Sequence, residues 1–400
     1  MIEIHPFKAW RPKPEFVEQV ACVPYDVIDS EEARLLSDGR PESFLHVVRP
    51  EIDLPDGISP YADEVYAAGA ANLRKMQEQG ILFQDEQPTL YLYQQQMDTH
   101  IQTGLFSCVA VRDYDENRIL KHELTRPDKE DDRTRHILTQ RAHAEPVMLT
   151  YKPDETIKNL ARKELSASQP VYSFIASDGV VHRLWQIKQT HAFIEAFRNV
   201  EKLYVADGHH RCKSASRVAE QLRKGDYGQD EFEYFPAVII PMDEMQILAY
   251  NRIVKTIPAD FPEMLQDTFT LREDVHPVPA SPGNVCLYLD GRWYGLPLPD
   301  DSPKDVADQL DVSRLHWHLL MPLLGIVNQR TDPNLGFAGG IRGTEELERL
   351  VDAGKAQLAI SMYPTSIQQL MEVADNNQLM PPKSTWFEPK LRSGLLVHTF

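Results

Sequence analysis

A short apolar segment that stops at an aspartate–glycine pair and continues directly as a helix constrains the fold of this chain more than any other feature. Residues 203–206 (LYVA) are apolar and short, as expected for a buried strand. Asp207 and Gly208 then supply a tight turn, in which glycine lets a ligand approach the backbone closely. Beyond the turn, small or apolar side chains recur near the helical period, at Cys212, Ala215, Ala219 and Leu222. The sequence therefore predicts a strand–turn–helix unit.

The first turn of this predicted helix carries His209, His210 and Arg211. Backbone N–H groups at a helix start lack intrahelical acceptors, and together with the helix dipole they attract anions, usually phosphate. Arg211 suits bidentate contact with phosphate oxygens, the histidines donate hydrogen bonds or move protons, and Asp207 is a candidate ligand for Mg²⁺. Neighbouring helical histidines diverge by about 100°, which disfavours a shared zinc ion. The alternative is that Asp207 only caps the helix and the histidines are surface polar residues.

The charge of the chain limits its partners. The 400 residues carry a formal net charge of −18 at pH 7, and no run of five or six Lys or Arg residues occurs. Such a chain repels nucleic-acid phosphates, so we do not expect it to bind nucleic acid. Small anions respond to the local field, so a nucleotide and a small-molecule substrate remain compatible with this composition. The oligomeric state stays open, with a homodimer as one alternative.

Cysteine spacing and the first residues of the chain bear on its location. The four cysteines, at 22, 108, 212 and 286, form no C-x-x-C pair and no disulfide framework, which predicts free thiols in a reducing compartment. Residues 1–10 show no basic segment followed by an apolar one, and no apolar run of 18 residues occurs. We therefore expect a cytoplasmic enzyme or small-molecule binder without a membrane span.

Strand and helix patterns alternate without a regular βαβ rhythm, which favours an α+β fold with mixed sheets over a doubly wound one. The length of the chain predicts more than one domain: a core over 1–256, an inserted hairpin-rich lobe over 257–304, and an α/β region over 305–400 that packs on the core. Helices are predicted at 59–80, from about 126, and at 191–200, 312–325, 344–354 and 366–377. Strands are predicted at 89–96, 104–114, 146–151, 235–241, 245–254 and 357–364, with hairpins at Asp178-Gly179 and within 285–296.

The stretch HELTRPDKEDDRTRH supplies a second set of candidates. Lys129 and Arg133 share one face of the helix predicted there and are candidates to reach the phosphate site. Glu123, just before the helix, is a candidate base for an attacking hydroxyl. The alternative is an ordinary solvated helix face laced with ion pairs, with Glu123 as a loop residue.

Two further stretches carry candidates for substrate binding. Asn251 and Arg252 end a predicted strand and suit a substrate carboxylate, although strand-edge residues facing water are the alternative. Lys383 lies in a polar loop, PPKSTWFEPK, that is no Walker loop because G-x-x-x-x-G-K-[ST] does not occur.

Three stretches together, VADGHHR, RPDKEDDRTRH and MPPKSTWFEPKLRSGLL, resemble the bacterial and archaeal domain-of-unknown-function family 1015 over nearly the whole chain. Its members are often labelled SpoOJ/ParA/ParB/RepB-like. The strand–D-G-H-H-R–helix unit is also similar to the phosphate-binding element of the ParB/sulfiredoxin superfamily, which includes free-serine kinases, ATP-using sulfiredoxins and CTP-binding ParB proteins.

This resemblance implies a ParB/sulfiredoxin-like nucleotide-binding core within 1–256, with a nucleotide di- or triphosphate at Gly208–Arg211. In such folds the early strand region lines the nucleotide pocket, so Asp26 is a candidate base, second Mg²⁺ ligand or substrate ligand. The order H-H-R-C here departs from the C-H-R of sulfiredoxins, so we expect Cys212 to be a packing residue.

The leading hypothesis is phosphoryl transfer between ATP or ADP, with Mg²⁺, and a small hydroxylated metabolite, with free serine first by resemblance. Glu123 or Asp26 acts as base, with the two histidines as further catalytic candidates. The same parts would serve a phosphoserine-hydrolysing or other metal-dependent phosphohydrolase, and a hydrolase centred on His209 or His210 is a further alternative. A ParB-like nucleotide switch on DNA is disfavoured by the net charge and by the lack of a basic recognition helix.

Overall fold

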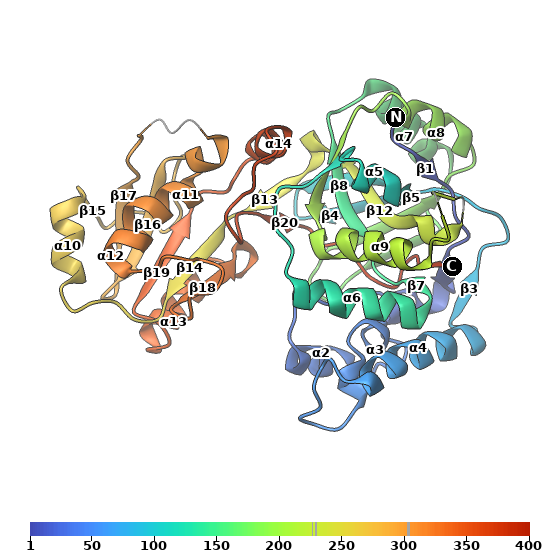
Figure 1. The fold of residues 1–400 in the computed structure, drawn as a ribbon, viewed down its shortest axis with the longest axis horizontal. Helices are drawn as coiled ribbons and strands as arrows, with labels where there is room; N and C mark the ends of the chain where they lie inside the picture. Colours follow the sequence, from blue (N-terminus) through green and yellow to red (C-terminus); the bar gives the residue numbers. More distant parts are fainter. Residues whose placement is uncertain (226, 229, 302–304) are drawn as a thin grey trace. The chain divides into compact units, whose positions relative to one another are not determined.

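The computed structural model describes residues 1–225, 227–228, 230–301 and 305–400, and these form two compact units (Figure 1). Unit 1 contains Met1–Met245 and Pro389–Phe400, and unit 2 contains Gln246–Glu388. This grouping differs from the three-part division expected from the sequence, because 257–304 falls in one unit with the residues up to 388. The last three residues of that predicted lobe, 302–304, lie outside the described residues.

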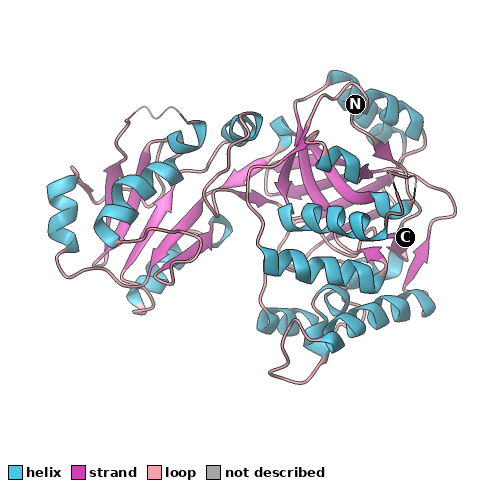
Figure 2. Cartoon of the chain, viewed as in Figure 1, coloured by secondary structure: helices cyan, strands magenta, loops and turns pink. Residues whose placement is uncertain are grey.

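Unit 1 is built on a mixed sheet, which confirms the predicted α+β class (Figure 2). Its strands follow the order β6-β11-β8-β12-β5-β4-β10-β9, and β1 also pairs with β5. The bounds are β1 Ile4–His5, β4 Tyr91–Met97, β5 His100–Ala110, β6 Ile119–Leu120, β8 Val147–Tyr151, β9 Tyr172–Ile175, β10 Val181–Gln186, β11 Leu203–Asp207 and β12 Tyr234–Pro241. The pairs β6–β11 and β8–β12 are parallel and the other pairs are antiparallel. The hairpin predicted at Asp178-Gly179 is confirmed as β9–β10. The strands predicted over 89–96 and 104–114 pair with each other as β4 and β5, although the second one ends at Ala110, where α5 follows.

Short strand pairs join distant parts of unit 1. The last strand of the chain, β21 (His398–Thr399), pairs with β7 (Ala142–His143) in antiparallel register, and β2 (Trp10–Pro12) pairs with β3 (Leu82–Gln84). The C-terminal segment from Pro389 is thereby held in unit 1, beside residues that precede it by more than two hundred positions.

The helices of unit 1 are α1 Val17–Val20, α2 Ser30–Ser37, α3 Leu45–Val48, α4 Asp63–Glu78, α5 Val111–Asp115, α6 Pro127–Gln140, α7 Glu155–Ala167, α8 Thr190–Phe197 and α9 His209–Leu222. α6 packs against both α9 and α4 (Figure 1). The helix predicted over 59–80 begins at Asp63, because Ala62 rather than Ser59 takes the extended N-cap conformation. Within the described ranges, no helix combines the length and apolar composition needed to cross a membrane.

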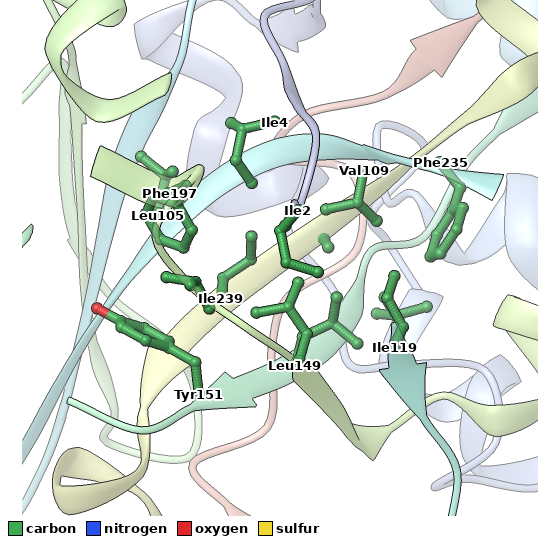
Figure 3. Packing of buried hydrophobic residues seen from close by; sticks show 14 of the residues in the cluster. Ile2, Ile4, Leu105, Val109, Ile119, Leu149, Tyr151, Phe197, Phe235 and Ile239 are labelled. Carbon is green, nitrogen blue, oxygen red and sulfur yellow. The ribbon is translucent and has the colours of Figure 1, made fainter. Parts of the chain in front are cut away.

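The main core of unit 1 lies between its sheet and the helices that cover it. Side chains of β5, β8 and β12 meet Ile2 and Ile4 of the N-terminal segment there (Figure 3). Cys212, Ala215 and Ala219 present the predicted small-residue face of α9 to this core, and all three are fully buried. The close packing of α9 on the sheet fixes the position of its first turn.

Unit 2 contains an antiparallel sheet in the order β15-β17-β16-β19-β14-β18. Its strands are β14 Tyr250–Val254, β15 Arg272–Glu273, β16 Asn284–Leu289, β17 Arg292–Pro297, β18 Leu335–Gly339 and β19 Leu358–Met362, and β13 (Gln246–Leu248) pairs separately with β20 (Trp386–Glu388). Its helices include α10 Phe261–Thr268, α13 Glu345–Asp352 and α14 Ile367–Asp375. The helix predicted over 312–325 is divided into α11 (Asp311–Leu315), a π-helical turn (His316–Leu320) and α12 (Met321–Leu324).

Candidate functional site

The predicted strand–turn–helix unit is present as β11, Gly208 and α9. The register of β11 against β8 shifts between Val205 and Asp207, so the strand bulges at its end and redirects Asp207. Gly208 has φ +104°, a left-handed conformation that L side chains rarely adopt, and it serves as the N-cap of α9. A strand that stops in this way leaves the backbone N–H groups of the first helical turn without intrahelical acceptors.

Gly208 also brings the backbone close to two neighbours. A Cβ at this position would lie 3.1 Å from Cγ1 of Val147 and 3.2 Å from Cζ and Nε of Arg211. We expect Gly208→Ala to lower the free energy of unfolding by about 2–3 kcal/mol, from backbone strain together with the displacement of Arg211. Urea denaturation measures this change.

Gly179→Ala is the matched control for this substitution. Gly179 has φ +82°, and an added Cβ would meet no atom of the described residues within 4 Å. The control therefore carries the backbone strain without the contacts. Equal losses of stability in the two variants would show that the approach to Arg211 is unimportant.

Asp207 lies between two cations at the start of α9. Its Oδ2 is 3.0 Å from Nζ of Lys390, and its Oδ1 is 3.4 Å from Nη2 of Arg211. Burial opposes ionisation of Asp207, but the positive charges of Lys390 and Arg211 outweigh it and hold the pKa of the carboxyl well below its ordinary value. Asp207 is therefore an anion that holds the two cations side by side.

Arg211 is 8% exposed and is held from three directions. One Nη atom donates to the carbonyl oxygen of Pro146, and the other lies near Asp207 and 3.6 Å from Oδ2 of Asp26. Burial by itself lowers the pKa of this guanidinium. The negative charges of Asp26, Asp207 and Glu145 raise the pKa by more than burial lowers it, so it lies above its ordinary value. Asp26 is more open, with its side chain 34% exposed. Arg211 thus connects Asp26 with Asp207, which the sequence separates by most of unit 1.

A set of buried side chains centred on Glu145 lies next to Arg211. Oε1 of Glu145 accepts hydrogen bonds from the backbone N–H of Tyr25 at 3.1 Å and from Oγ of Ser393 at 3.0 Å. The guanidinium of Arg133 stacks 3.9 Å from the centre of the Tyr25 ring and lies 3.8 Å from Oε2 of Glu145. Burial raises the pKa of Glu145, against the opposing charges of Arg211 and Arg133. Arg133, predicted on α6, therefore reaches the surroundings of Arg211.

Two histidines pack together behind the turn. The rings of His122 and His209 meet edge to face at 4.4 Å, and the backbone N–H of His122 lies 3.5 Å from Nε2 of His209. Burial lowers the pKa of His122 to about 3 and also lowers that of His209. Both rings are therefore neutral at pH 7 and act as hydrogen-bonding groups, not as cations. His210, half-buried, follows them in the first turn of α9, and Glu123 follows His122 directly.

The neighbour of the histidines along α9, Cys212, packs in the core. It is fully buried, and burial raises the pKa of its thiol to about 12. The predicted packing role is confirmed.

Other predicted residues make their contacts elsewhere. Nζ of Lys129 is 3.1 Å from the hydroxyl of Tyr61, which precedes α4. Arg252 is fully buried in β14 of unit 2, where it bonds to the carbonyl of Tyr250 and stacks on Phe337.

Its neighbour Asn251 accepts a hydrogen bond at Oδ1 from the backbone N–H of Met362 at 3.0 Å. The exposed Lys383 lies 5.3 Å from the ring centre of Tyr250. Asn251, Arg252 and Lys383 thus belong to unit 2, and their roles in substrate binding stay predictions.

Sequence reasoning missed two members of the site, Lys390 and Glu145. Lys390 lies in the C-terminal stretch FEPKLRSGLL, seven residues after the candidate Lys383. It is 183 positions away from its partner Asp207 in the sequence. Glu145 precedes Pro146 and a buried strand, where an acidic residue is unusual. The acidic residue just before a buried strand was the one local feature that could have identified Glu145 as a member of the site.

The arrangement suits a small anion with several oxygens. The first turn of α9 offers backbone N–H groups, and Arg211 and Lys390 add charged donors held by one carboxylate. Among the described residues, no group of three or more His, Cys, Asp or Glu side chains is placed to hold a metal ion. Mg²⁺ needs only one or two carboxylates beside phosphates and water. The partly exposed Asp26 fits that requirement better than the predicted ligand Asp207, because Asp207 is already paired with Lys390 and Arg211.

Comparison with solved structures gives matches at low sequence identity. A free serine kinase in complex with AMP is 12% identical, with a TM-score of 0.38, covering 72% of this chain and 92% of that one. A conserved hypothetical protein from Pyrococcus furiosus is 12% identical, with a TM-score of 0.36, covering 72% and 95%. SbnI with a C-terminal truncation, from Staphylococcus aureus, is 14% identical, with a TM-score of 0.39, covering 73% and 87%. A comparison with curated proteins gives no match.

A family model provides the assignment. The model described as "Protein of unknown function (DUF1015)" matches residues 4–313, which include the whole strand–turn–helix unit and most of the chain. The predicted family is thereby confirmed over residues 4–313, which contain two of the three stretches, VADGHHR and RPDKEDDRTRH. The chain belongs to the DUF1015 family.

Proposed function

We propose that this protein is a nucleotide-dependent phosphotransferase that acts on a small hydroxylated metabolite. The observation that carries the proposal is the pairing of Asp207 with both Arg211 and Lys390 at the start of α9. Phosphoryl transfer depends mainly on positioning and on stabilising charge over the phosphate oxygens. The two cations and the start of α9, whose position is fixed by the bulge in β11 and by Gly208, supply both requirements in one place.

The roles of the residues follow from their exposure and charge. The phosphates lie over Gly208–Arg211, where Arg211 and Lys390 contact their oxygens. Asp26 is the base that best fits, because its carboxylate is partly exposed and lies 3.6 Å from Arg211, beside the start of α9. Glu123 is the alternative base, because it adjoins His122 at the back of the turn. His209 and His210 donate hydrogen bonds to the phosphate oxygens.

The proposed step is a balanced displacement. The hydroxyl oxygen of the acceptor forms a bond to the terminal phosphorus, and the bond from that phosphorus to the bridging oxygen breaks. The bridging oxygen leaves with the electron pair, and the hydroxyl proton passes to the carboxylate of Asp26. Mg²⁺ supplies charge neutralisation when it is bound with the nucleotide, and ATP or ADP serves as donor. Free serine is the leading acceptor because of the family resemblance.

Nucleotide binding and product formation test this proposal separately. Titration calorimetry with ATP, ADP and AMP, with and without Mg²⁺, is expected to give binding that Asp207→Asn weakens at least tenfold. Phosphorus NMR of the best nucleotide with L-serine is expected to show a new phosphomonoester signal. The matched control is Asp243→Asn, which removes a carboxylate that pairs with Lys158 on the surface of unit 1.

Three outcomes decide the proposal. Equal nucleotide affinity in the wild type and in Asp207→Asn would overturn the phosphate assignment. Release of inorganic phosphate from O-phosphoserine, with no requirement for nucleotide, would replace the kinase reaction by a phosphohydrolase reaction. A phosphomonoester signal that is lost in Asp26→Asn would support the assignment of the base.

A further inference from the structure

A second recess of unit 1 shares Arg211 with the helix start but opens beneath α6. It encloses about 450 Å³ of space, its open mouth included. Its titratable lining residues are Arg133, His136, His143, Glu145 and Arg211. Its remaining wall is formed by Val48, Ile137, Gln140, Ala142, Ala144, Val147, Phe235 and Pro236. We call it the α6 pocket.

Three nitrogen atoms of residues that line the α6 pocket lack hydrogen-bond partners within the part of the chain that the structure describes. They are Nδ1 of His136, Nε2 of His143 and Nε of Arg211. These side chains belong to residues that are 5%, 3% and 8% exposed, respectively. A buried polar group left unpaired costs about 1–3 kcal/mol, so native proteins nearly always give it a partner. Three such atoms around one recess indicate a polar guest.

The charges around the pocket indicate what the guest carries. The N–H at Nε of Arg211 is an obligate donor, which favours a carboxylate on the guest. The guanidinium of Arg133 is already paired with Asp132 at 2.6 Å, so its charge is largely compensated. Glu145 supplies a carboxylate that attracts an ammonium group. Burial lowers the pKa of His136 and His143, so their neutral rings donate to or accept from a hydroxyl or amine. The remaining wall is apolar apart from Gln140.

We propose that the α6 pocket is the acceptor site of this protein and that it takes a small α-amino or α-hydroxy acid through its carboxylate. The inference rests on the proposed function and adds the class and location of the acceptor. Arg211 connects the two sites, because it lines the pocket while its Nη2 lies near both Asp26 and Asp207.

The ring nitrogens of His136 and His143 report directly on the pocket. The full-length protein labelled with ¹⁵N-histidine is titrated with L-serine, D-glycerate and ethanolamine, with and without AMP, and the signals are assigned from His136→Asn and His143→Asn. We expect serine and glycerate, which carry a carboxylate, to shift both ring signals, and ethanolamine to leave them unchanged. Unchanged signals with serine and glycerate, or equal shifts with ethanolamine, would overturn the proposal.

A variant with a larger side chain inside the α6 pocket gives the second measurement, which is serine affinity. Ala144→Val adds bulk inside the α6 pocket, and the matched control Ala161→Val adds the same bulk in a separate pocket of unit 1. We expect Ala144→Val alone to weaken serine binding at least tenfold while nucleotide affinity stays unchanged. Equal serine affinity in the two variants would contradict the assignment. If Ala144→Val does not fold, the titration of the wild type still decides.

The two proposals fail in different ways. Nucleotide binding without any response of the two histidines to serine or glycerate overturns the acceptor site alone. A response of the histidines without nucleotide binding overturns the phosphotransferase and supports the pocket as a carboxylate site.

Discussion

Replacing Arg211 by glutamine is expected to lower nucleotide affinity at least a hundredfold and to lower the free energy of unfolding by about 3–5 kcal/mol. Arg211 is 8% exposed and lies between Asp26 and Asp207, with Glu145 behind it. Removal of its charge leaves these carboxylates facing one another in a poorly solvated place. It also removes a guanidinium that offers charged N–H donors to a phosphate at the start of α9. Calorimetric titration with nucleotide and urea denaturation measure the two effects.

Arg217→Gln is the matched control for this change. Arg217 lies on the same helix and pairs with Glu130 at 3.2 Å and with Asp131, but its side chain is 27% exposed. Exposed ion pairs contribute at most about 1 kcal/mol, so we expect small losses of stability and unchanged nucleotide affinity. If Arg211→Gln behaved like Arg217→Gln in both measurements, Arg211 would be an ordinary structural arginine and the phosphate site would lie elsewhere. Arg211→Lys separates the effect of charge from the effect of geometry, because lysine keeps the positive charge but lacks the planar guanidinium.

Local sequence signals predicted the centre of this site because they depend on near neighbours. Strand termination, a left-handed glycine and small residues at helical spacing act within twenty residues, and β11, Gly208 and α9 follow them. The same holds for α6, where Pro127 sets the start of the helix. The α+β class followed from the irregular alternation of such local units.

Pairings between distant segments were not predictable in this way. Lys390 reaches Asp207 because β21 returns the end of the chain to β7 in unit 1, and no local pattern specifies that return. Glu145 joins the site because the segment around Tyr25 passes beside it. Arg252 shows another limit of local signals: the alternative of a strand-edge residue facing water is wrong, because the side chain is fully buried and its strand lies inside the sheet of unit 2. The predicted helix over 312–325 contains a π-helical turn, which the spacing of apolar residues does not reveal.

Acid is expected to destabilise the protein through the buried histidines behind the turn, well before its carboxylates are protonated. His122 titrates near pH 6.5 when it is unfolded, whereas burial lowers its folded pKa to about 3. Between these values the unfolded state binds more protons than the folded state, so stability is complete above pH 6.5 and falls as the pH is lowered. From pH 7 to pH 4, His122 alone accounts for a loss of about 3 kcal/mol. Urea denaturation at intervals of half a pH unit measures this slope.

His122→Asn isolates this contribution, because asparagine keeps a polar side chain but binds no proton in this range. We expect the variant to lose about 3 kcal/mol less than the wild type between pH 7 and pH 4, whatever its stability at pH 7. His191→Asn on α8 is the matched control, since the side chain of His191 is 84% exposed, and its slope should equal that of the wild type. Because the rings of His122 and His209 touch at 4.4 Å, a proton on either ring must open the packing behind Gly208. Because burial lowers the folded pKa of His122 to about 3, this ring takes up no proton in the folded state between pH 7 and pH 4.5. The pH dependence of nucleotide affinity should therefore be the same in the wild type and in His122→Asn over this range, and a steeper fall of affinity in the wild type would show that the ring is protonated in the folded state.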